Sequence, residues 1–346
     1  MNSNINIKII TEKRSDAIHL CNESIIHNLK NSGANIKVIL LNDKPFRNSY
    51  INFILEILNI IKLVFMINRD DIVLFTDPLS FNMLVSIFIP NKKYVIFYHY
   101  ERDPFYYKFI PFLSYRKILG KLDGIMCISN FSLIQLNSLG VDPKKCKVIY
   151  SGVNHNLFKP SSLRLHSFDY ILSIGSEEPR KNMKNILQSF QILNKNFPNL
   201  KLVKVGKVSS KNRETTMKYI KKLHLTKNVI FTDYIEEKDL PKLYSGAKLL
   251  LFPSLLEGFG LPIVEAMACG CPVVTSNRNP MQELVGPEQL TIDPLNPDEI
   301  ARICKVILSD NSYRNAMIQK GLERSKKFNW EITAKDTYDF ITAEHK

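Results

Sequence analysis

The chain has 346 residues, of which 45% are hydrophobic and 23% charged, and its formal net charge is +14. These values are typical of a globular protein of two domains and exclude a disordered or fibrous chain. The positive charge favours an anionic partner, which could be nucleic acid, acidic lipid or a phosphorylated small molecule, with a solvated basic surface as the commonest alternative. No run of five or six like charges marks a nucleic-acid arm, so we expect no nucleic-acid partner.

Short apolar runs alternate with helical patterns through the first half of the chain. They are apolar on both faces, as in a parallel sheet that helices cover on each side. Residues 51–67 form a longer apolar stretch, but Glu56 and Lys62 interrupt it and it is too short to span a membrane, so we interpret it as a buried helix. We expect strands at residues 5–10, 36–41, 72–75, 94–98, 124–128 and 148–150.

The pattern breaks after Pro160, where the polar sequence SSLRLHS at residues 161–167 is the best linker candidate. A second series of strands and helices follows, which predicts two doubly wound α/β domains of the Rossmann type facing across a cleft. We place the first domain at residues 1–160 and the second at 168–328. In the second we expect strands at 170–174, 202–205, 229–231, 249–252 and 272–275, and helices that include 182–194 and 298–309.

The N-terminus has no long apolar core behind a basic start, so we expect no secretory signal and a cytoplasmic protein. The six cysteines, at positions 21, 127, 146, 269, 271 and 304, lack the paired spacings of a zinc site or a disulfide framework. They are interpreted as free thiols, and no metal site is expected.

The most informative stretch, residues 249–275, reads LLLFPSLLEGFGLPIVEAMACGCPVVT and predicts a strand, a glycine loop, a helix and a second strand. Pro262 suits the first helical turn and Gly270 the helix end. The glycines at 258 and 260 allow the backbone to approach a ligand where the helix starts, and free N–H groups at a helix start bind anions such as pyrophosphate.

Two glutamates accompany this loop, with seven residues between them. A carboxylate accepts two hydrogen bonds from neighbouring hydroxyls, so Glu257 and Glu265 beside a phosphate site suit a ribose and a hexose. On spacing alone the alternative stays open that the glycines make a turn and that both glutamates are solvated.

A second motif, SIGSEEPRKN at residues 173–182, follows the first strand of the second domain. Arg180 and Lys181 would neutralise a diphosphate and stabilise it as a leaving group. The alternative is an exposed basic pair, which is unfavourable at a helix start unless an anion binds there.

Both motifs resemble the donor site of glycosyltransferase family 4, in the variant that ends in Glu-Pro-Arg-Lys-Asn. The resemblance implies the GT-B fold and metal-independent transfer with retention from a nucleoside-diphosphate sugar, without a further cofactor. It assigns Glu265 to the donor ribose and Glu257 to the transferred sugar, with Arg180 and Lys181 on the diphosphate. The other donor-binding residues that it implies are Gly175, Ile235, whose backbone would read the base, and the loop residues Gly258, Phe259, Gly260 and Leu261.

Further segments resemble the same family over most of the chain. His99 follows the strand at 94–98 and matches a histidine near the donor sugar. The segment FNWEITA resembles the closing helix that crosses back to the first domain, here residues 329–346 with Trp330 as its anchor. One departure is that TEKRSDAIHL, after the first strand, lacks the family's glycine-rich loop, so no residue there is assigned a role.

Residues 105–121 mix aromatic and basic side chains, as a helix on an anionic membrane surface would. A core-facing helix with snorkelling lysines is the equal alternative. In the membrane interpretation four cations attract lipid and three rings insert: Lys108, Arg116, Lys117, Lys121, Phe105, Tyr106 and Phe112.

The sequence thus predicts a hexosyltransferase, with mannose or glucose as the sugar and a glycan or lipid-linked sugar as the acceptor. It would be cytoplasmic, with a possible peripheral position on the inner face of the membrane. Two alternatives stay open: a non-catalytic sugar-nucleotide-binding protein, prompted by the missing glycine loop, and a sugar-nucleotide epimerase of the same fold.

Overall fold

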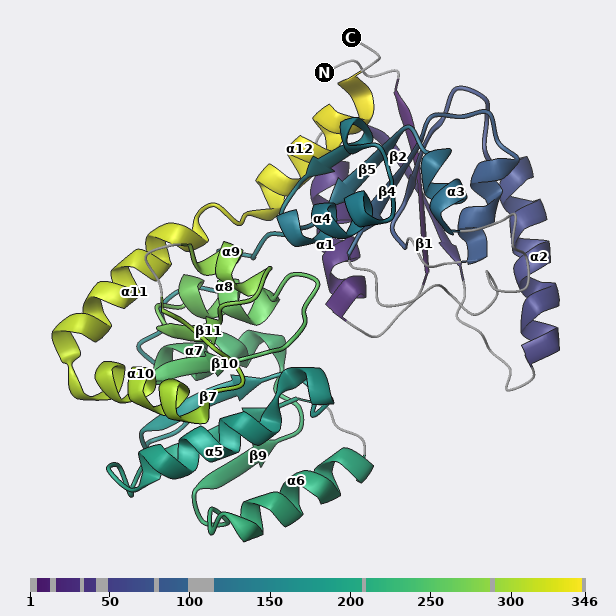
Figure 1. Ribbon diagram of the computed structural model, residues 1–346. Coiled ribbons are helices and arrows are strands. Elements are labelled where there is room, and N and C mark those ends of the chain that lie inside the picture. The colour runs from purple at the N-terminus through teal and green to yellow at the C-terminus, as the bar shows by residue number, and fades with distance from the viewer. Residues whose placement is uncertain are drawn as a thin grey trace. The chain divides into compact units, whose positions relative to one another are not determined.

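The computed structural model describes residues 5–12, 17–31, 34–41, 49–77, 81–98, 115–206, 210–286 and 290–343. The chain forms two compact units (Figure 1). The N-terminal unit comprises Met1–Gly152 with Trp330–Lys346, and the C-terminal unit comprises Val153–Asn329. The predicted linker at 161–167 therefore lies inside the C-terminal unit, eight residues beyond its first residue, Val153.

The described part of the N-terminal unit contains a six-stranded parallel sheet in the order β2-β1-β3-β4-β5-β6. Its strands are β1 (Asn6–Glu12), β2 (Asn35–Leu41), β3 (Ile72–Phe75), β4 (Lys93–Phe97), β5 (Gly124–Cys127) and β6 (Cys146–Val148). Its helices are α1 (Ala17–Lys30), α2 (Ser49–Met66), α3 (Tyr115–Gly120), α4 (Asn130–Ser138) and α12 (Trp330–Thr342), with 3₁₀ turns η1 (Phe81–Ile87) and η4 (Pro143–Lys145). All four residues of β3 and of β5 are buried, as the two-sided apolar pattern requires.

The described part of the C-terminal unit contains a second six-stranded parallel sheet, in the order β12-β11-β10-β7-β8-β9. Its strands are β7 (Tyr170–Ile174), β8 (Lys201–Val205), β9 (Val229–Thr232), β10 (Leu249–Phe252), β11 (Val273–Ser276) and β12 (Thr291–Ile292). Its helices are α5 (Met183–Asn194), α6 (Ser210–Lys222), α7 (Leu240–Gly246), α8 (Leu261–Ala268), α9 (Met281–Val285), α10 (Pro297–Ser309) and α11 (Asn311–Ser325), with 3₁₀ turns η5 (Pro179–Lys181) and η6 (Glu237–Asp239). Both sheets confirm the doubly wound α/β class.

The core of the C-terminal unit explains why its helices and strands could be predicted from the apolar pattern of the sequence. Ile186, Leu187, Phe190 and Leu193 of α5 recur at helical spacing, and all of them are buried in one cluster with strand residues such as Leu202. A helix with one apolar face that packs on an apolar strand gives two different spacings of apolar residues, so both elements can be assigned from the sequence.

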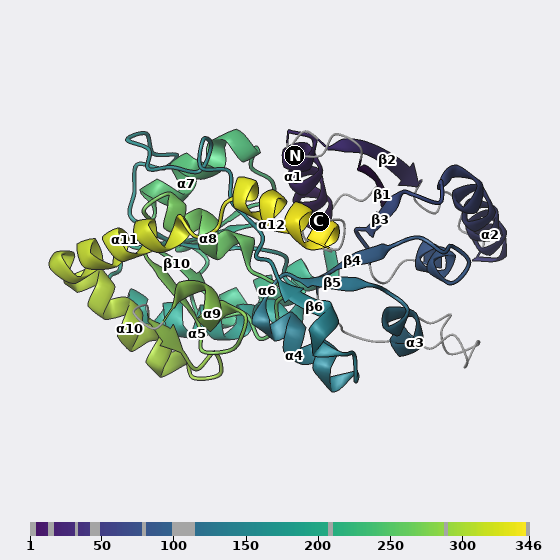
Figure 2. The same cartoon turned by 90° about the horizontal axis from the view of Figure 1, so that it is seen from above.

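The last helix belongs to the N-terminal unit. Both views show α12 alongside α1 (Figures 1 and 2). The Phe340 ring meets Tyr94 edge-on at 5.6 Å between centroids, and Thr333 Oγ1 donates a hydrogen bond of 2.7 Å to the Tyr150 carbonyl. Trp330, at the start of the helix, is buried.

Two details of the sequence-based prediction are wrong. The strand expected at 148–150 is β6, two residues earlier, because its ladder pairs Cys146 with Ile125. The helix expected to be buried at 51–67 forms as α2, but only part of it faces the core: Leu63 is fully buried whereas Phe65 is 84% exposed. None of the described helices is long and apolar enough to cross a bilayer.

Candidate functional site

The two motifs of the second domain meet at one edge of its sheet. Strands β7 and β10 are parallel neighbours, so the loops that follow them leave the sheet at the same carboxyl edge. The first loop carries Gly175 and the turn η5, and the second carries Glu257. The Leu255 amide ties the loops together by donating to the Arg180 carbonyl at 2.7 Å.

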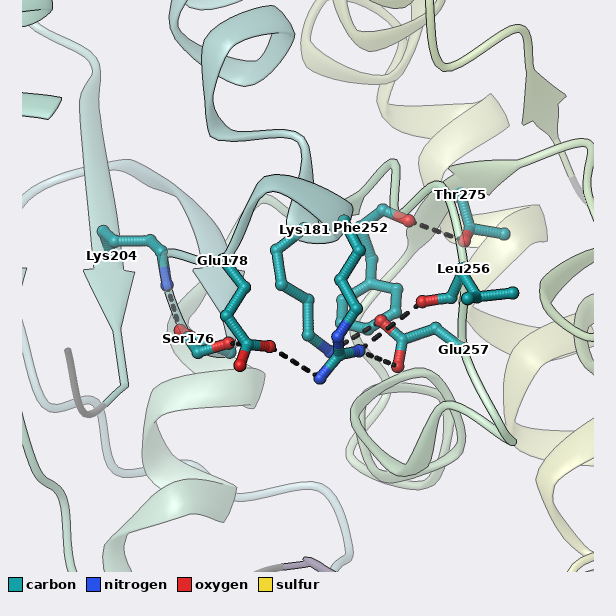
Figure 3. Close-up of polar contacts among 10 residues, drawn as sticks. Ser176, Glu178, Lys181, Lys204, Phe252, Leu256, Glu257 and Thr275 are labelled. Atoms are coloured by element: carbon teal, nitrogen blue, oxygen red, sulfur yellow. Dashed lines mark hydrogen bonds and ion pairs between the residues drawn. The ribbon is translucent and has the colours of Figure 1, made fainter. Parts of the chain in front are cut away.

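Glu257 accepts hydrogen bonds from both predicted diphosphate cations (Figure 3). Lys181 Nζ lies 2.6 Å from Glu257 Oε1, and Arg180 Nη1 lies 3.3 Å from Oε2. The Glu257 side chain is only 9% exposed and that of Lys181 14%. The other face of the Lys181 ammonium lies 5.0 Å from the centroid of the Phe252 ring. A buried carboxylate and two cations thus form one cluster, which we call the Glu257 cluster.

Burial lowers the pKa of Lys181, and the charge and hydrogen bond of Glu257 oppose that shift. Glu257 thus offsets part of the effect that burial has on Lys181. Arg180 is more exposed, and its Nη2 also pairs with Glu178 at 2.8 Å. Phosphate oxygens are suited to such a site because they add anionic acceptors beside two fixed cations.

Asn182 locks the loop that carries these cations. Its backbone is in the left-handed region, with φ of 61° and ψ of 37°. The side-chain amide is buried and donates to the carbonyls of Pro253 at 3.0 Å and Pro294 at 2.6 Å, while its oxygen accepts from Asn185 Nδ2 at 2.9 Å. One side chain therefore joins the start of α5 to the loops that follow β10 and β12.

Gly175 lies directly beneath Lys181, since a Cβ atom there would stand 3.3 Å from Lys181 Cε. Its backbone φ of 132° favours glycine. On its other side a Cβ on Gly206 would lie 2.2 Å from the Gly175 carbonyl oxygen, so both positions need a bare backbone. Lys204 Nζ, buried near the end of β8, donates to the Gly175 carbonyl (Figure 3). It also donates to the Val205 carbonyl at 3.0 Å.

The glycine loop after β10 leads into α8 as the sequence predicts. Gly260 caps the helix with φ of 116°, and Leu261 is its first residue. Phe259 is buried and meets Phe328 edge-on at 5.9 Å between ring centroids, so its ring serves packing. Gly258 is half-buried beside Glu257.

Glu265, on α8, is half-buried and hydrogen-bonded by a residue that the sequence did not single out. Its Oε2 accepts from the hydroxyl of buried Tyr244 on α7 at 2.6 Å. Burial raises the pKa of Glu265 to about 7, with a smaller upward contribution from the charge of Glu237, and the Tyr244 hydrogen bond acts in the opposite direction. Ile235 lies two residues before Glu237 and is half-buried, so the predicted base-reading segment lies within electrostatic range of the predicted ribose carboxylate.

The structure therefore brings Gly175, Arg180, Lys181 and Glu257 together and places Glu265 on the helix that follows. His99 lies outside the described residues, as does residue 108 with the three aromatic rings at 105, 106 and 112. Among the described residues no group of three His, Cys, Asp or Glu side chains is arranged to hold a metal ion.

Sequence reasoning missed Asn182, Lys204 and Tyr244 as site residues. Lys204 did give a signal, because a lysine stands inside the apolar run KLVKV, where a buried charge needs a partner. Asn182 ends the motif SIGSEEPRKN, but the motif did not indicate its hydrogen bonds to Pro253 and Pro294. Tyr244 gave no signal, since its role depends on a carboxylate that is distant in sequence.

Comparisons with known proteins agree with this geometry. The chain is 36% identical over 166 residues to the O-antigen chain mannosyltransferase B of Escherichia coli, a match that covers 47% of this chain and 42% of that protein. It is 27% identical over 243 residues to the MMP alpha-(1->4)-mannosyltransferase of Mycolicibacterium hassiacum, covering 68% and 58%. The chain thus matches less than two thirds of the length of either relative.

The fold has a solved counterpart in HepE of Anabaena, whose crystal structure is a complex with UDP and glucose. The TM-score is 0.80 at 18% sequence identity, over 98% of this chain and 100% of that one. Residues 156–324 match the family model described as glycosyl transferases group 1, a range that contains every described residue of the site above. The match lies within the C-terminal unit, which is therefore similar to the group 1 glycosyl transferases.

Proposed function

We propose that the protein is a retaining glycosyltransferase that moves a hexose from a nucleoside-diphosphate sugar to a glycan or lipid-linked acceptor. The observation that carries the proposal is the Glu257 cluster. Two cations and a buried carboxylate converge at the carboxyl edge of a parallel sheet, where ligands of this fold class bind. The cations suit a diphosphate and the carboxylate suits sugar hydroxyls.

The same cluster supports transfer without a metal ion. As the bond between sugar and diphosphate breaks, negative charge grows on the leaving phosphate oxygen. Arg180 and Lys181 are already held nearby by Glu257 and by the lock at Asn182, so the charge meets fixed cations. Divalent ions perform that task in other enzymes.

Mannose is the first sugar to test. The curated relatives above are named as mannosyltransferases. Glucose is the second, because HepE was solved with UDP and glucose.

The acceptor proposal is a lipid-linked sugar at the inner face of a membrane, with the protein cytoplasmic and peripheral. Two exposed features of the N-terminal unit support it. Arg116 and Lys117 of α3 are exposed, and Leu58, Ile61 and Phe65 form an exposed apolar stripe on α2. Both helices pack on the same turn, η1, and cations beside apolar side chains suit an anionic lipid surface.

A panel of nucleotide sugars tests the activity. The purified chain should be stabilised thermally by one NDP-hexose and should release nucleoside diphosphate from it in the presence of EDTA. Glu257→Gln should abolish most of that release. Glu323→Gln is the matched control, because Glu323 forms an ion pair of the same 2.6 Å length but in solvent.

The outcomes separate the alternatives. Binding of the nucleotide sugar without release of nucleoside diphosphate, whichever acceptor extract is added, supports a non-catalytic sugar-nucleotide-binding protein. Conversion of the sugar within its nucleotide, with no release of diphosphate, supports an epimerase. Activity lost in EDTA and restored by magnesium or manganese contradicts the metal-independent mechanism.

A further inference from the structure

Arg213 of α6 joins the two loops on either side of strand β8. Its Nε donates to Glu177 Oε1 at 2.7 Å, and its Nη2 donates to Asp233 Oδ1 at 2.7 Å. The guanidinium plane also lies over the Phe231 ring, with 4.0 Å between Cζ and the ring centroid. Three contacts in different directions fix this side chain, which is 23% exposed.

The Glu177 end of this bridge is buried and rigid. The Glu177 side chain is fully buried, and its Oε2 has no hydrogen-bond partner among the described residues. A buried carboxylate is costly without a cation, so Glu177 holds Arg213 tightly. The Asp233 end is different, because that side chain is 69% exposed and is free to adjust.

The two anchors belong to segments with separate tasks in the proposed donor site. Glu177 lies in the phosphate loop, between Gly175 and Arg180. Asp233 follows β9 and stands two residues before Ile235, in the segment assigned to the base. The sheet order is β7-β8-β9, so the two loops are separated by the width of β8, and Arg213 spans that gap.

We infer that Arg213 is a positioning residue that holds the base-reading segment at a fixed distance from the phosphate loop and thereby sets which nucleoside diphosphate the site prefers. The inference rests on the proposed function. A pyrimidine and a purine place their hydrogen-bonding edges at different distances from the diphosphate. A fixed distance between the two protein segments therefore selects one of them.

Isothermal titration with UDP, GDP and inorganic pyrophosphate tests the inference. The first variant, Asp233→Asn, weakens the link at its exposed end and leaves the buried Glu177–Arg213 pair intact. We expect the favoured nucleotide to bind more weakly by up to about fivefold, as for the weakening of a largely exposed ion pair. The preference between UDP and GDP should shrink, while pyrophosphate affinity stays at the wild-type value, since pyrophosphate carries no base and Asp233 lies outside the phosphate loop.

Arg213→Met completes a double-mutant cycle. If the two side chains act through one link, the double variant binds nucleotide no more weakly than Arg213→Met alone. Lys218→Gln is the control, because Lys218 is an exposed residue of the same helix that pairs with Glu214 at 2.6 Å. Should Arg213→Met fail to fold, Asp233→Asn still decides the question.

Wild-type affinity and preference in Asp233→Asn would overturn the inference, as would additive losses in the cycle. Both results leave the proposed function standing. A wild-type protein that binds no nucleoside diphosphate would instead refute the proposed function, and this inference with it.

Discussion

Replacing Glu257 by glutamine separates the two tasks of the candidate site, which are to bind a diphosphate and to orient a sugar. The amide keeps the size of the side chain and one acceptor oxygen, but it removes the negative charge from the Glu257 cluster. Lys181 then loses the neighbour that keeps its pKa from falling further.

The magnitude follows from the geometry. A hydrogen bond to a charged group contributes about 1.5–3 kcal/mol, whereas a neutral one contributes about 0.5–1.5 kcal/mol. If the carboxylate accepts from sugar hydroxyls in the transition state, turnover should fall by roughly 10- to 100-fold. Nucleoside diphosphate should bind as well as in wild type or several-fold more tightly, because the carboxylate 2.6 Å from Lys181 no longer competes for that cation.

Steady-state release of nucleoside diphosphate and titration calorimetry measure the two effects separately. The gain in product affinity should be largest at low pH, where Lys181 stays protonated without Glu257. Glu323→Gln, in its exposed pair with Lys326, should change neither quantity. Wild-type turnover in Glu257→Gln, or a loss of diphosphate affinity together with turnover, would refute the reasoning.

Three further predictions use other parts of the molecule. If ionised Glu265 binds the donor, donor affinity should rise with pH around its pKa of about 7. Tyr244→Phe removes the hydrogen bond that lowers this pKa, so the rise should move to higher pH in binding titrations from pH 5.5 to 8.5. Identical profiles for the wild type and the variant would contradict this. Burial lowers the pKa of Lys204 to about 8, so between that pH and the ordinary lysine pKa only the unfolded chain keeps the proton. The free energy of unfolding of the wild type relative to Lys204→Met should therefore rise by up to about 1.4 kcal/mol per pH unit in urea titrations. A difference that stays flat between pH 7 and 10 would rule this out. The protein should co-sediment with anionic liposomes at low salt and less so after Arg116→Glu with Lys117→Glu, and indifference to such liposomes would favour a soluble acceptor.

The fold was predictable because its signal is local. Strands such as β3 and β7 are short apolar runs between turn residues, and α5 shows its buried face at helical spacing. All six described strands of the first sheet and five of the six of the second could therefore be predicted. The two-residue strand β12 could not, since two residues carry no period. The exposed face of α2 was not predicted, because an apolar stretch does not show which of its side chains will pack against a neighbouring element.

The candidate site was predictable where a motif concentrates it. Glu257, Arg180 and Lys181 stand in two short segments that share one sheet edge. What the sequence could not supply is the mutual pairing of these charges, because an ion pair across 76 residues has no local signature. For the same reason the sequence did not predict that Tyr244 pairs with Glu265 or that Arg213 pairs with Glu177.

The contact between Gly206 and Gly175 constrains how this protein can vary. At Gly124, Gly140 and Gly246 an added Cβ would also come within 3.0 Å of another residue, but there the nearest atoms belong to side chains, which a second substitution can shorten. Here the obstacle to a Cβ on Gly206 is the carbonyl group of Gly175, and no amino acid lacks a carbonyl. Mutant libraries that aim at a new donor should therefore keep Gly175 and Gly206 and vary the segment around Ile235, where side chains are partly exposed and a second substitution can accommodate the first.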